Sequence, residues 1–148
     1  MFMNQLAPTI ECKVEGKDPP LSFDTGASET YLFVRYYQRF RSESRAWKKS
    51  KAEIAGAGGV MKRKIYIQPR IKLGVGDKTV TLERVLIYTS GVGTSTHDVL
   101  YGNLGQDAAA KFESFTLNFS AMTFSLGRLL APERRTSKFR SVKPAYGS

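Results

Sequence analysis

Short alternating runs of apolar and polar residues, separated by glycine-rich breaks, occupy most of the chain. Residues 9–16 (TIECKVEG) and 21–26 (LSFDTG) each alternate as a half-buried strand does. The same period runs through residues 63–88, where Pro69 indicates an edge position or a bulge and GVGD a tight hairpin turn. It returns in residues 114–127 (SFTLNFSAMTFSLG), a terminal hairpin. The pattern therefore predicts a chain that is mainly β.

Two segments have a helical period instead. Residues 34–51 (VRYYQRFRSESRAWKKSK) place aromatic side chains on one side and basic side chains on the other. Residues 106–115 (QDAAAKFESF) are alanine-rich, and Asp107 lies where a negative charge favours a helix N-terminus. We expect one or two short helices among the strands.

The length and the composition fit one domain with its own core. The chain has 148 residues, of which 41% are hydrophobic. No apolar run approaches the roughly 18 residues that span a bilayer, and the start has no signal-peptide pattern. We expect an N-terminal extension over residues 1–8, a folded domain over 9–130 and a basic flexible tail over 131–148. A leader or an anchor on a longer parent is compatible with this division.

The net charge of +10 comes from one segment and from the tail. Residues 35–51 hold seven lysines and arginines against Glu43, and residues 131–148 hold five against Glu133. Such clusters can form a patch that binds nucleic acid or an acidic membrane surface. They can equally be a solvated helix face followed by a disordered tail.

One cysteine and one histidine restrict the chemistry of the chain. Cys12 lies in an alternating apolar pattern, so we expect a buried structural thiol rather than a nucleophile. A zinc site normally needs three or four ligands of these kinds, so no metal and no cofactor are expected. His97 and Asp98 stand side by side in a polar loop without a nearby nucleophile signal, and we interpret His97 as solvated.

A single acid, Asp24, interrupts the apolar strand of residues 21–26. Gly26 permits a sharp turn directly after it, and the Thr25 hydroxyl can donate to a buried backbone group. Two such carboxylates about 3 Å apart cannot both ionise, so they share one proton. The pair then supplies a general base and a general acid together, which suits attack of water on a peptide bond.

The residues FDTGA (23–27) resemble the active-site signature of aspartic proteases, specifically the single-domain, retroviral-type retropepsin-like group. Three further elements follow in the order of that family. AGAGG (55–59) stands where the family has its glycine-rich flap, NLGQD (103–107) is similar to its Leu-Gly-x-Asp step, and residues 114–127 are similar to its closing hairpin. YGNLGQD and FESFTLNFSAMTF look especially like bacterial members, some of which come from periplasmic or membrane-tethered parents.

The resemblance implies an all-β fold, a closed acid-protease barrel that corresponds to one half of a pepsin-like fold. It makes Asp24 the catalytic carboxylate and Thr25 the source of a hydrogen bond across a dimer. Gly26 and Ala27 would shape the floor of the loop. The flap would comprise four residues, Gly56, Ala57, Gly58 and Gly59. Behind the loop, Leu104 and Gly105 would brace it, and Asp107 would be structural.

The motif occurs once, because no other aspartate is followed by Thr-Gly or Ser-Gly. The chain therefore supplies half of a dyad, and the resemblance implies a homodimer with Asp24 of each subunit on the two-fold axis. A protein or peptide substrate would bind as an extended strand. Two departures from the family are Asn118, where an aspartate is frequent, and the long basic segment 35–51. The resemblance also suggests the bacterial periplasm or cell envelope, if a leader or anchor was removed.

Two other functions compete with an aspartic endopeptidase. A retropepsin-like fold can serve as a non-catalytic dimerisation or peptide-binding module, although the intact Asp24, Thr25 and Gly26 speak against this. Alternatively, the basic segment and the tail can bind nucleic acid or an anionic surface, which predicts strong salt dependence. The last function can coexist with the first.

Overall fold

The computed structural model describes residues 1–4, 7–56, 59–90 and 100–131. The flap residues Ala57 and Gly58, the pair His97 and Asp98, and nearly all of the expected tail lie outside the described residues. The strands are β1 (Phe2–Asn4), β2 (Ala7–Glu11), β3 (Lys13–Val14), β4 (Pro20–Phe23), β5 (Tyr31–Leu32), β6 (Lys48–Gly56), β7 (Gly59–Val75), β8 (Lys78–Tyr88), β9 (Gly102–Leu104), β10 (Phe115–Asn118) and β11 (Thr123–Leu126). The helices are α1 (Val34–Arg39), the 3-10 helix η1 (Arg41–Ala46) and α2 (Gln106–Ala109).

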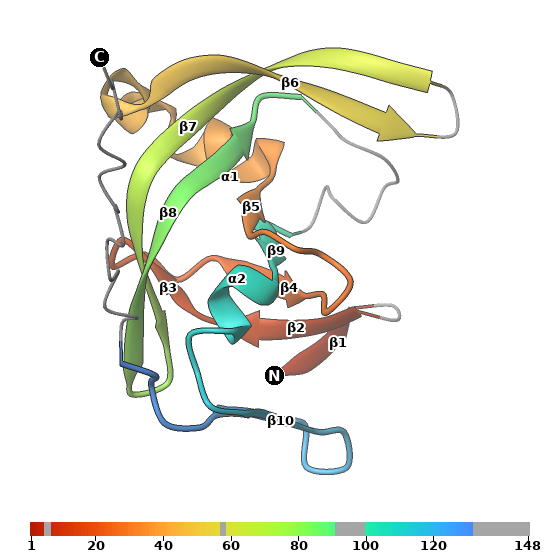
Figure 1. Ribbon diagram of the computed structural model, residues 1–148, viewed down its shortest axis with the longest axis vertical. Coiled ribbons are helices and arrows are strands. Elements are labelled where there is room, and N and C mark those ends of the chain that lie inside the picture. The colour runs from red at the N-terminus through yellow and green to blue at the C-terminus, as the bar shows by residue number, and fades with distance from the viewer. Residues whose placement is uncertain (5–6, 57–58, 91–99, 132–148) are drawn as a thin grey trace, which may run out of the picture.

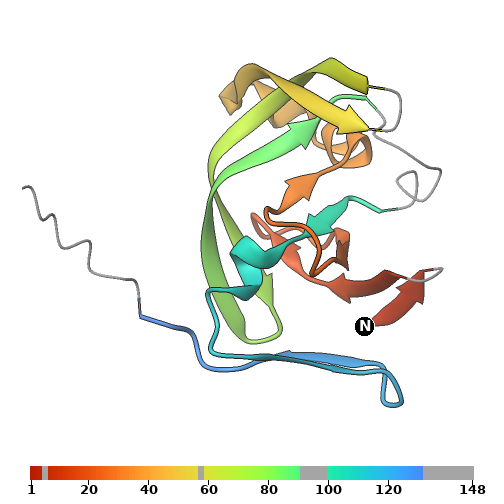
Figure 2. The same cartoon turned by 45° about the vertical axis from the view of Figure 1, so that its right-hand side comes forward.

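Most of the described strands form one sheet that curls into a nearly closed barrel (Figure 1). Its order is β1-β2-β4-β9-β5-β8-β7-β3, and β6 pairs with β7. Fully buried side chains from strands far apart in sequence meet inside it, among them Leu21, Leu32, Ile71 and Ile87. The hairpin of β10 and β11 forms a separate sheet that extends beyond the body of the molecule (Figure 2).

The strands expected from alternation are present with different bounds at two places. The strand expected over residues 9–16 is divided at Cys12 into β2 and β3, and the one expected over residues 21–26 ends at Phe23. Residues 63–88 form β7 and β8 around a tight turn at Gly76, whose φ is +58°. Pro69 lies on β7 between the stretch that pairs with β6 and the stretch that pairs with β3, so it occupies a local edge. The ladder to β8 also skips Pro69 and its neighbour across the strands, Arg84, whose φ is +56°. A missing N–H is tolerated at such a place.

The prediction of a single helix over residues 34–51 is wrong. The helix α1 ends at Arg39, η1 follows it, and the chain is extended from Lys48. Aromatic and serine residues give this segment little intrinsic helix propensity. Strand pairing of β6 with β7 and burial of Trp47 against Tyr36 therefore determine the structure.

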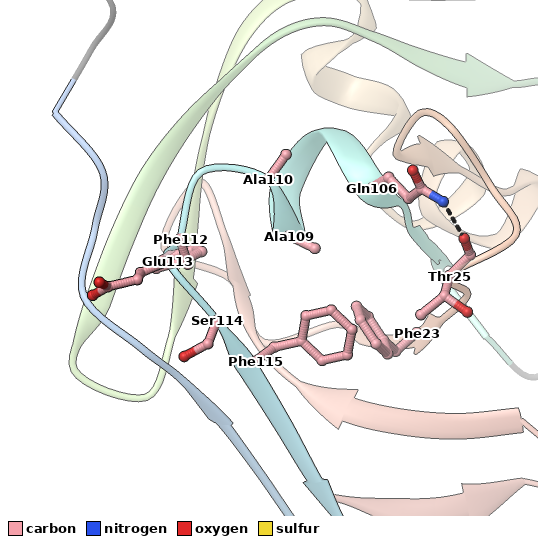
Figure 3. Close-up of a pocket in the computed structure, with 9 residues that line it drawn as sticks. All are labelled: Phe23, Thr25, Gln106, Ala109, Ala110, Phe112, Glu113, Ser114 and Phe115. Carbon is pink, nitrogen blue, oxygen red and sulfur yellow. Dashed lines mark hydrogen bonds between the residues drawn. The ribbon is translucent and has the colours of Figure 1, made fainter.

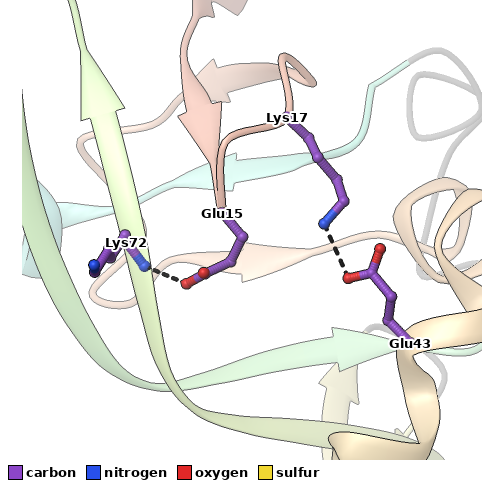
Figure 4. A network of polar contacts seen from close by, with 4 residues as sticks. All are labelled: Glu15, Lys17, Glu43 and Lys72. Carbon is purple, nitrogen blue, oxygen red and sulfur yellow. Dashed lines mark hydrogen bonds and ion pairs between the residues drawn. The ribbon is translucent and has the colours of Figure 1, made fainter.

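The turn after β3 is attached to two other elements by polar contacts (Figure 4). Glu15 has a φ of +51°, and its Oε1 accepts a hydrogen bond from the Lys72 backbone N–H at 2.5 Å. Lys17 Nζ lies 2.9 Å from a carboxylate oxygen of Glu43 in η1. These contacts fix the turn against β7 and against the short 3-10 helix.

The prediction of a buried structural thiol at Cys12 is confirmed. The residue is 5% exposed, and its Sγ lies 3.4 Å from the Pro19 carbonyl oxygen, to which it donates. Burial raises the pKa of the Cys12 thiol to about 12. None of the described helices is long and apolar enough to cross a membrane.

Candidate active site

A parallel pair of buried strands positions Asp24. Leu21 and Phe23 of β4 are buried beside β9, and Phe23 pairs with Leu104. The chain leaves the sheet at the next residue, where the Asp24 N–H still donates to the Leu104 carbonyl oxygen at 3.1 Å. The Asp24 side chain is exposed. A carboxylate is thus held in solvent at the end of a strand that cannot move independently of the core.

The loop after β4 folds back onto this carboxylate. The Gly26 N–H donates to Asp24 Oδ1 at 2.8 Å, and the Ala27 N–H donates to the Asp24 carbonyl oxygen at 3.2 Å. A Cβ atom on Gly26 would lie 3.1 Å from the same Oδ1, so glycine permits this close approach. Such a side-chain turn orients one carboxylate oxygen and leaves the other available.

The second carboxylate oxygen faces Asn103, a residue that sequence reasoning missed. Asn103 Nδ2 lies 3.4 Å from Asp24 Oδ2 and 3.4 Å from the Tyr31 hydroxyl. Asn103 is 3% exposed, and its Oδ1 accepts a hydrogen bond from Ser22 Oγ at 2.8 Å. The one sequence signal for it is an amide placed directly before the Leu-Gly step, in an otherwise apolar strand.

Asp107 joins the end of the Asp24 loop to the start of α2. Its Oδ1 accepts hydrogen bonds from the Thr30 N–H at 2.9 Å and from the Thr30 hydroxyl at 2.6 Å. The buried Thr30 Oγ1 in turn accepts from the Gly105 N–H at 3.1 Å. Bonds to a carboxylate are stronger than neutral ones, so this cluster anchors the loop exit.

Gly105 lies directly against the same loop. A Cβ atom at this position would lie 2.5 Å from the Glu29 carbonyl oxygen and 2.9 Å from that of Ala27. The Gln106 N–H also donates to the Ala27 carbonyl oxygen at 2.8 Å. The side-chain amide of Gln106 donates to the carbonyl oxygen of Thr25 (Figure 3). The loop of residues 24–30 and the start of α2 therefore form one packed unit.

Of the four residues expected to form the flap, Gly56 and Gly59 lie in the described part of the chain, where they form the last pair of the hairpin of β6 and β7. At the base of the hairpin, the ring of Tyr88 lies 5.7 Å from that of Tyr31. Burial raises the pKa of the Tyr88 phenol, and the neighbouring Tyr31 and Glu29 raise it further.

A cavity of about 530 Å³ opens beside Thr25, between α2 and β10 (Figure 3). It is lined mainly by apolar side chains, including Phe23, Ala109, Phe112 and Phe115. The rings of Phe23 and Phe115 meet edge to face at 5.0 Å. Among the described residues, no three histidine, cysteine, aspartate or glutamate side chains are grouped so that they could hold a metal ion.

Two solved structures are similar to this arrangement of strands. The retroviral protease-like domain of Ddi1 from Leishmania major superposes with a TM-score of 0.54 at 12% identity, over 81% of this chain and 87% of that one. The chain has a retropepsin-like fold. EIAV protease complexed with the inhibitor HBY-793 matches with a TM-score of 0.49 at 17% identity, over 74% of this chain and 91% of that one. No protein-family model and no curated protein matches the sequence.

The likeness confirms the fold class expected from the sequence, which is mainly β with short helices and a nearly closed barrel. In this retropepsin-like fold, Asp24, Thr25, Gly26 and Ala27 form the loop after β4. Leu104 and Gly105 lie behind that loop. At such low identity the likeness concerns the fold alone.

Proposed function

We propose that this chain is an aspartic endopeptidase that works as a homodimer, with one Asp24 from each subunit. The observation that carries the proposal is the placement of Asp24. It is an exposed carboxylate at the end of a buried strand, with one oxygen held by the Gly26 N–H, in a retropepsin-like fold. We also infer from YGNLGQD and FESFTLNFSAMTF that the chain belongs with the bacterial retropepsin-like proteases.

In the proposed reaction the two Asp24 carboxyl groups share one proton and hold a water molecule between them. The ionised carboxylate takes a proton from the water while the water oxygen forms a bond to the peptide carbonyl carbon. The protonated carboxyl group gives its proton to the carbonyl oxygen. Collapse of this tetrahedral intermediate breaks the C–N bond. The nitrogen leaves with a proton from one carboxyl group of the dyad, while a hydroxyl group of the intermediate gives its proton to the other carboxylate, so that the single shared proton is restored.

A second copy is needed because the chain carries one Asp-Thr-Gly sequence. Support for an interface comes from the apolar cavity beside Thr25. Support also comes from large apolar side chains on or next to the terminal hairpin that are 39–56% exposed, namely Phe115, Phe119, Leu129 and Leu130. Large apolar side chains left exposed are typical of a surface that another protein covers. The peptide substrate would lie as an extended strand between the flap hairpin and the loop after β4.

The deciding experiment compares the wild-type chain with Asp24→Asn on a mixed peptide library, with and without a pepstatin-type inhibitor. We expect cleavage by the wild type, inhibition by pepstatin, and no cleavage by a folded Asp24→Asn chain. Equal cleavage by the wild type and by Asp24→Asn would contradict the proposed mechanism. Sedimentation over a range of concentrations tests the dyad, because a chain that cleaves while strictly monomeric contradicts it.

A further inference from the structure

A groove with a volume of about 500 Å³ lies between α1 and the hairpin of β6 and β7. We call it the lysine groove, and its lining includes Lys49, Lys51, Lys64, Tyr37, Tyr66 and Thr89. The three lysine side chains are exposed, whereas the two tyrosines are half-buried. Positive charge therefore gathers over a partly apolar floor.

The strand register places the charges on one face. Lys51 lies directly opposite Lys64, and Lys49 lies opposite Tyr66. Like charges directly opposite each other destabilise a sheet, so this pair costs the fold free energy. Within the described part of the chain, none of the three lysines forms an ion pair. The nearest pair along this face joins Lys62 to Glu53 at 3.3 Å.

Protection of a sheet edge explains only part of this charge. Lysines on an edge strand prevent unwanted strand pairing, and in the described residues β6 pairs with β7 alone. That accounts for Lys49 and Lys51. It does not account for Lys64, which pairs with Lys51 of β6 on one side and whose carbonyl oxygen accepts a hydrogen bond from Thr89 Oγ1 at 2.8 Å on the other.

The lysine groove is separate from the candidate active site. The residues that line it are not among those that line the cavity beside Thr25. They also include neither Asp24 nor Asn103, the two residues whose side chains meet at the candidate site.

The arginines of the basic segment are used differently from its lysines. The guanidinium of Arg35 lies 4.9 Å from the ring centroid of Tyr101, and that of Arg39 lies 6.0 Å from it. Burial alone would raise the pKa of Tyr101, but hydrogen bonds and charge from Arg35 and Arg39 outweigh it and lower that pKa. These cation–π contacts belong to the packing of α1, whereas the lysines remain open to a partner.

We propose that the lysine groove binds an acidic segment of another polypeptide. The chain's own tail is an unsuitable occupant, since residues 131–148 hold five basic residues against one acidic residue. A second copy is also unsuitable, because no two of the 13 acidic residues of the chain stand closer than three positions apart, so the chain offers no acidic segment. An extended peptide repeats its side chains on one face at every second residue, which matches the spacing of Lys49 and Lys51.

Nucleic acid fits the groove less well than a peptide does. Binding of single strands uses open aromatic faces on which bases stack. The ring of Tyr37 stacks on that of Tyr66 at 5.5 Å, and the guanidinium of Arg41 lies 5.9 Å from the centroid of the Tyr37 ring. Trp47 also packs edge to face against Tyr66 at 5.8 Å. The groove thus offers point charges to carboxylates rather than a stacking platform.

The test measures the fluorescence anisotropy of a labelled peptide of alternating glutamate and serine as protein is added. The protein is the full chain with Asp24→Asn, so that the peptide is not cleaved during the measurement. The proposal is judged by binding alone, so it stands or falls independently of peptidase activity. In this background we compare Lys51→Gln/Lys64→Gln with Lys72→Gln, an exposed lysine on the same strand outside the groove. A thermal melt checks that the double variant is folded, as relief of the like-charge pair predicts.

We expect the double variant to bind at least about tenfold more weakly, the Lys72→Gln control to change by less than about twofold, and salt to weaken binding. Absence of binding overturns the proposal and leaves edge protection as the role of Lys49 and Lys51. Equal losses in the double variant and the control also overturn it, because the attraction is then only that of net charge. A thymidine oligonucleotide that binds more tightly than the peptide, with the same loss in the double variant, would identify a nucleic-acid site instead.

Discussion

Asn103 Nδ2 lies 3.4 Å from Oδ2 of Asp24, so a buried amide on β9 faces an exposed carboxylate on the loop after β4. The other oxygen of Asp24 accepts the Gly26 N–H at 2.8 Å. Donors from two separate segments therefore orient the two oxygens of one carboxylate. That carboxylate is held in place before any substrate arrives, which is what a positioned general base requires.

Replacement of Asn103 by leucine is expected to reduce activity more than stability. It removes the donor to Asp24 and leaves Ser22 Oγ without the Asn103 acceptor. We expect kcat/KM to fall by about ten- to a hundredfold, or about 1.4–2.7 kcal/mol, which is close to the range of about 1.5–3 kcal/mol for a hydrogen bond to a charged group. Peptide-cleavage kinetics measure it. Asn103→Asp, which keeps the shape but loses the N–H donor, should lose activity too, and wild-type kinetics in that variant would contradict the role.

Replacement of Asp107 by alanine should destabilise the fold. It leaves the buried Thr30 hydroxyl and the Thr30 N–H without their acceptor, which predicts a loss of about 2–4 kcal/mol in the free energy of unfolding. Urea denaturation measures the loss. The matched control is Glu53→Ala, whose exposed ion pair with Lys62 should contribute less than about 1 kcal/mol. Similar losses in the two variants would refute the anchoring role of Asp107.

Replacement of Gly105 by alanine tests the contact between α2 and the Asp24 loop. The new Cβ atom would lie 2.5 Å from the Glu29 carbonyl oxygen, so the backbone must shift. We expect overpacking to cost about 1–3 kcal/mol or more and activity to fall as Asp24 moves. Gly74→Ala is the control, because its nearest neighbour, Lys13 Cβ, would lie at an ordinary 3.4 Å. Unchanged melting of Gly105→Ala would rule out the clash.

Stability should fall in alkali because of Cys12. Burial raises the pKa of its thiol from 9.0 to about 12, so above pH 9 the unfolded chain loses this proton while the folded chain keeps it. The free energy of unfolding then decreases by about 1.4 kcal/mol per pH unit between pH 9 and pH 12. Urea titrations at pH 8.5 and pH 10 measure the slope, and Cys12→Ala should flatten it. Burial also raises the pKa of Tyr36 above its ordinary value of 10.0. The free energy of unfolding should therefore also fall above pH 10, in the wild type and in Cys12→Ala alike.

The acid at Asp24 and the Leu-Gly-x-Asp step could be found from sequence because each is a local pattern of residue types. The link between them could not, since Asn103 reaches Asp24 only through the parallel pairing of β4 with β9, strands about eighty residues apart. The helix expected over residues 34–51 failed for the same reason. The aromatic residues do have helical spacing, but Trp47 packs against Tyr66 and the lysines after it pair with β7. A local sequence period does not encode such contacts.

The braces of the loop do not use the Asp24 side chain. Thr30, Gly105 and Asp107 contact one another and the backbone of residues 27–29. A descendant of this chain that lost its carboxylate would lose the Gly26 contact but keep these contacts at residues 27–30, and it would remain under selection for those three residues. Asp24 would then be lost before the Leu-Gly-x-Asp residues are. The Leu-Gly-x-Asp sequence would therefore be the better marker of relatives that lack the carboxylate.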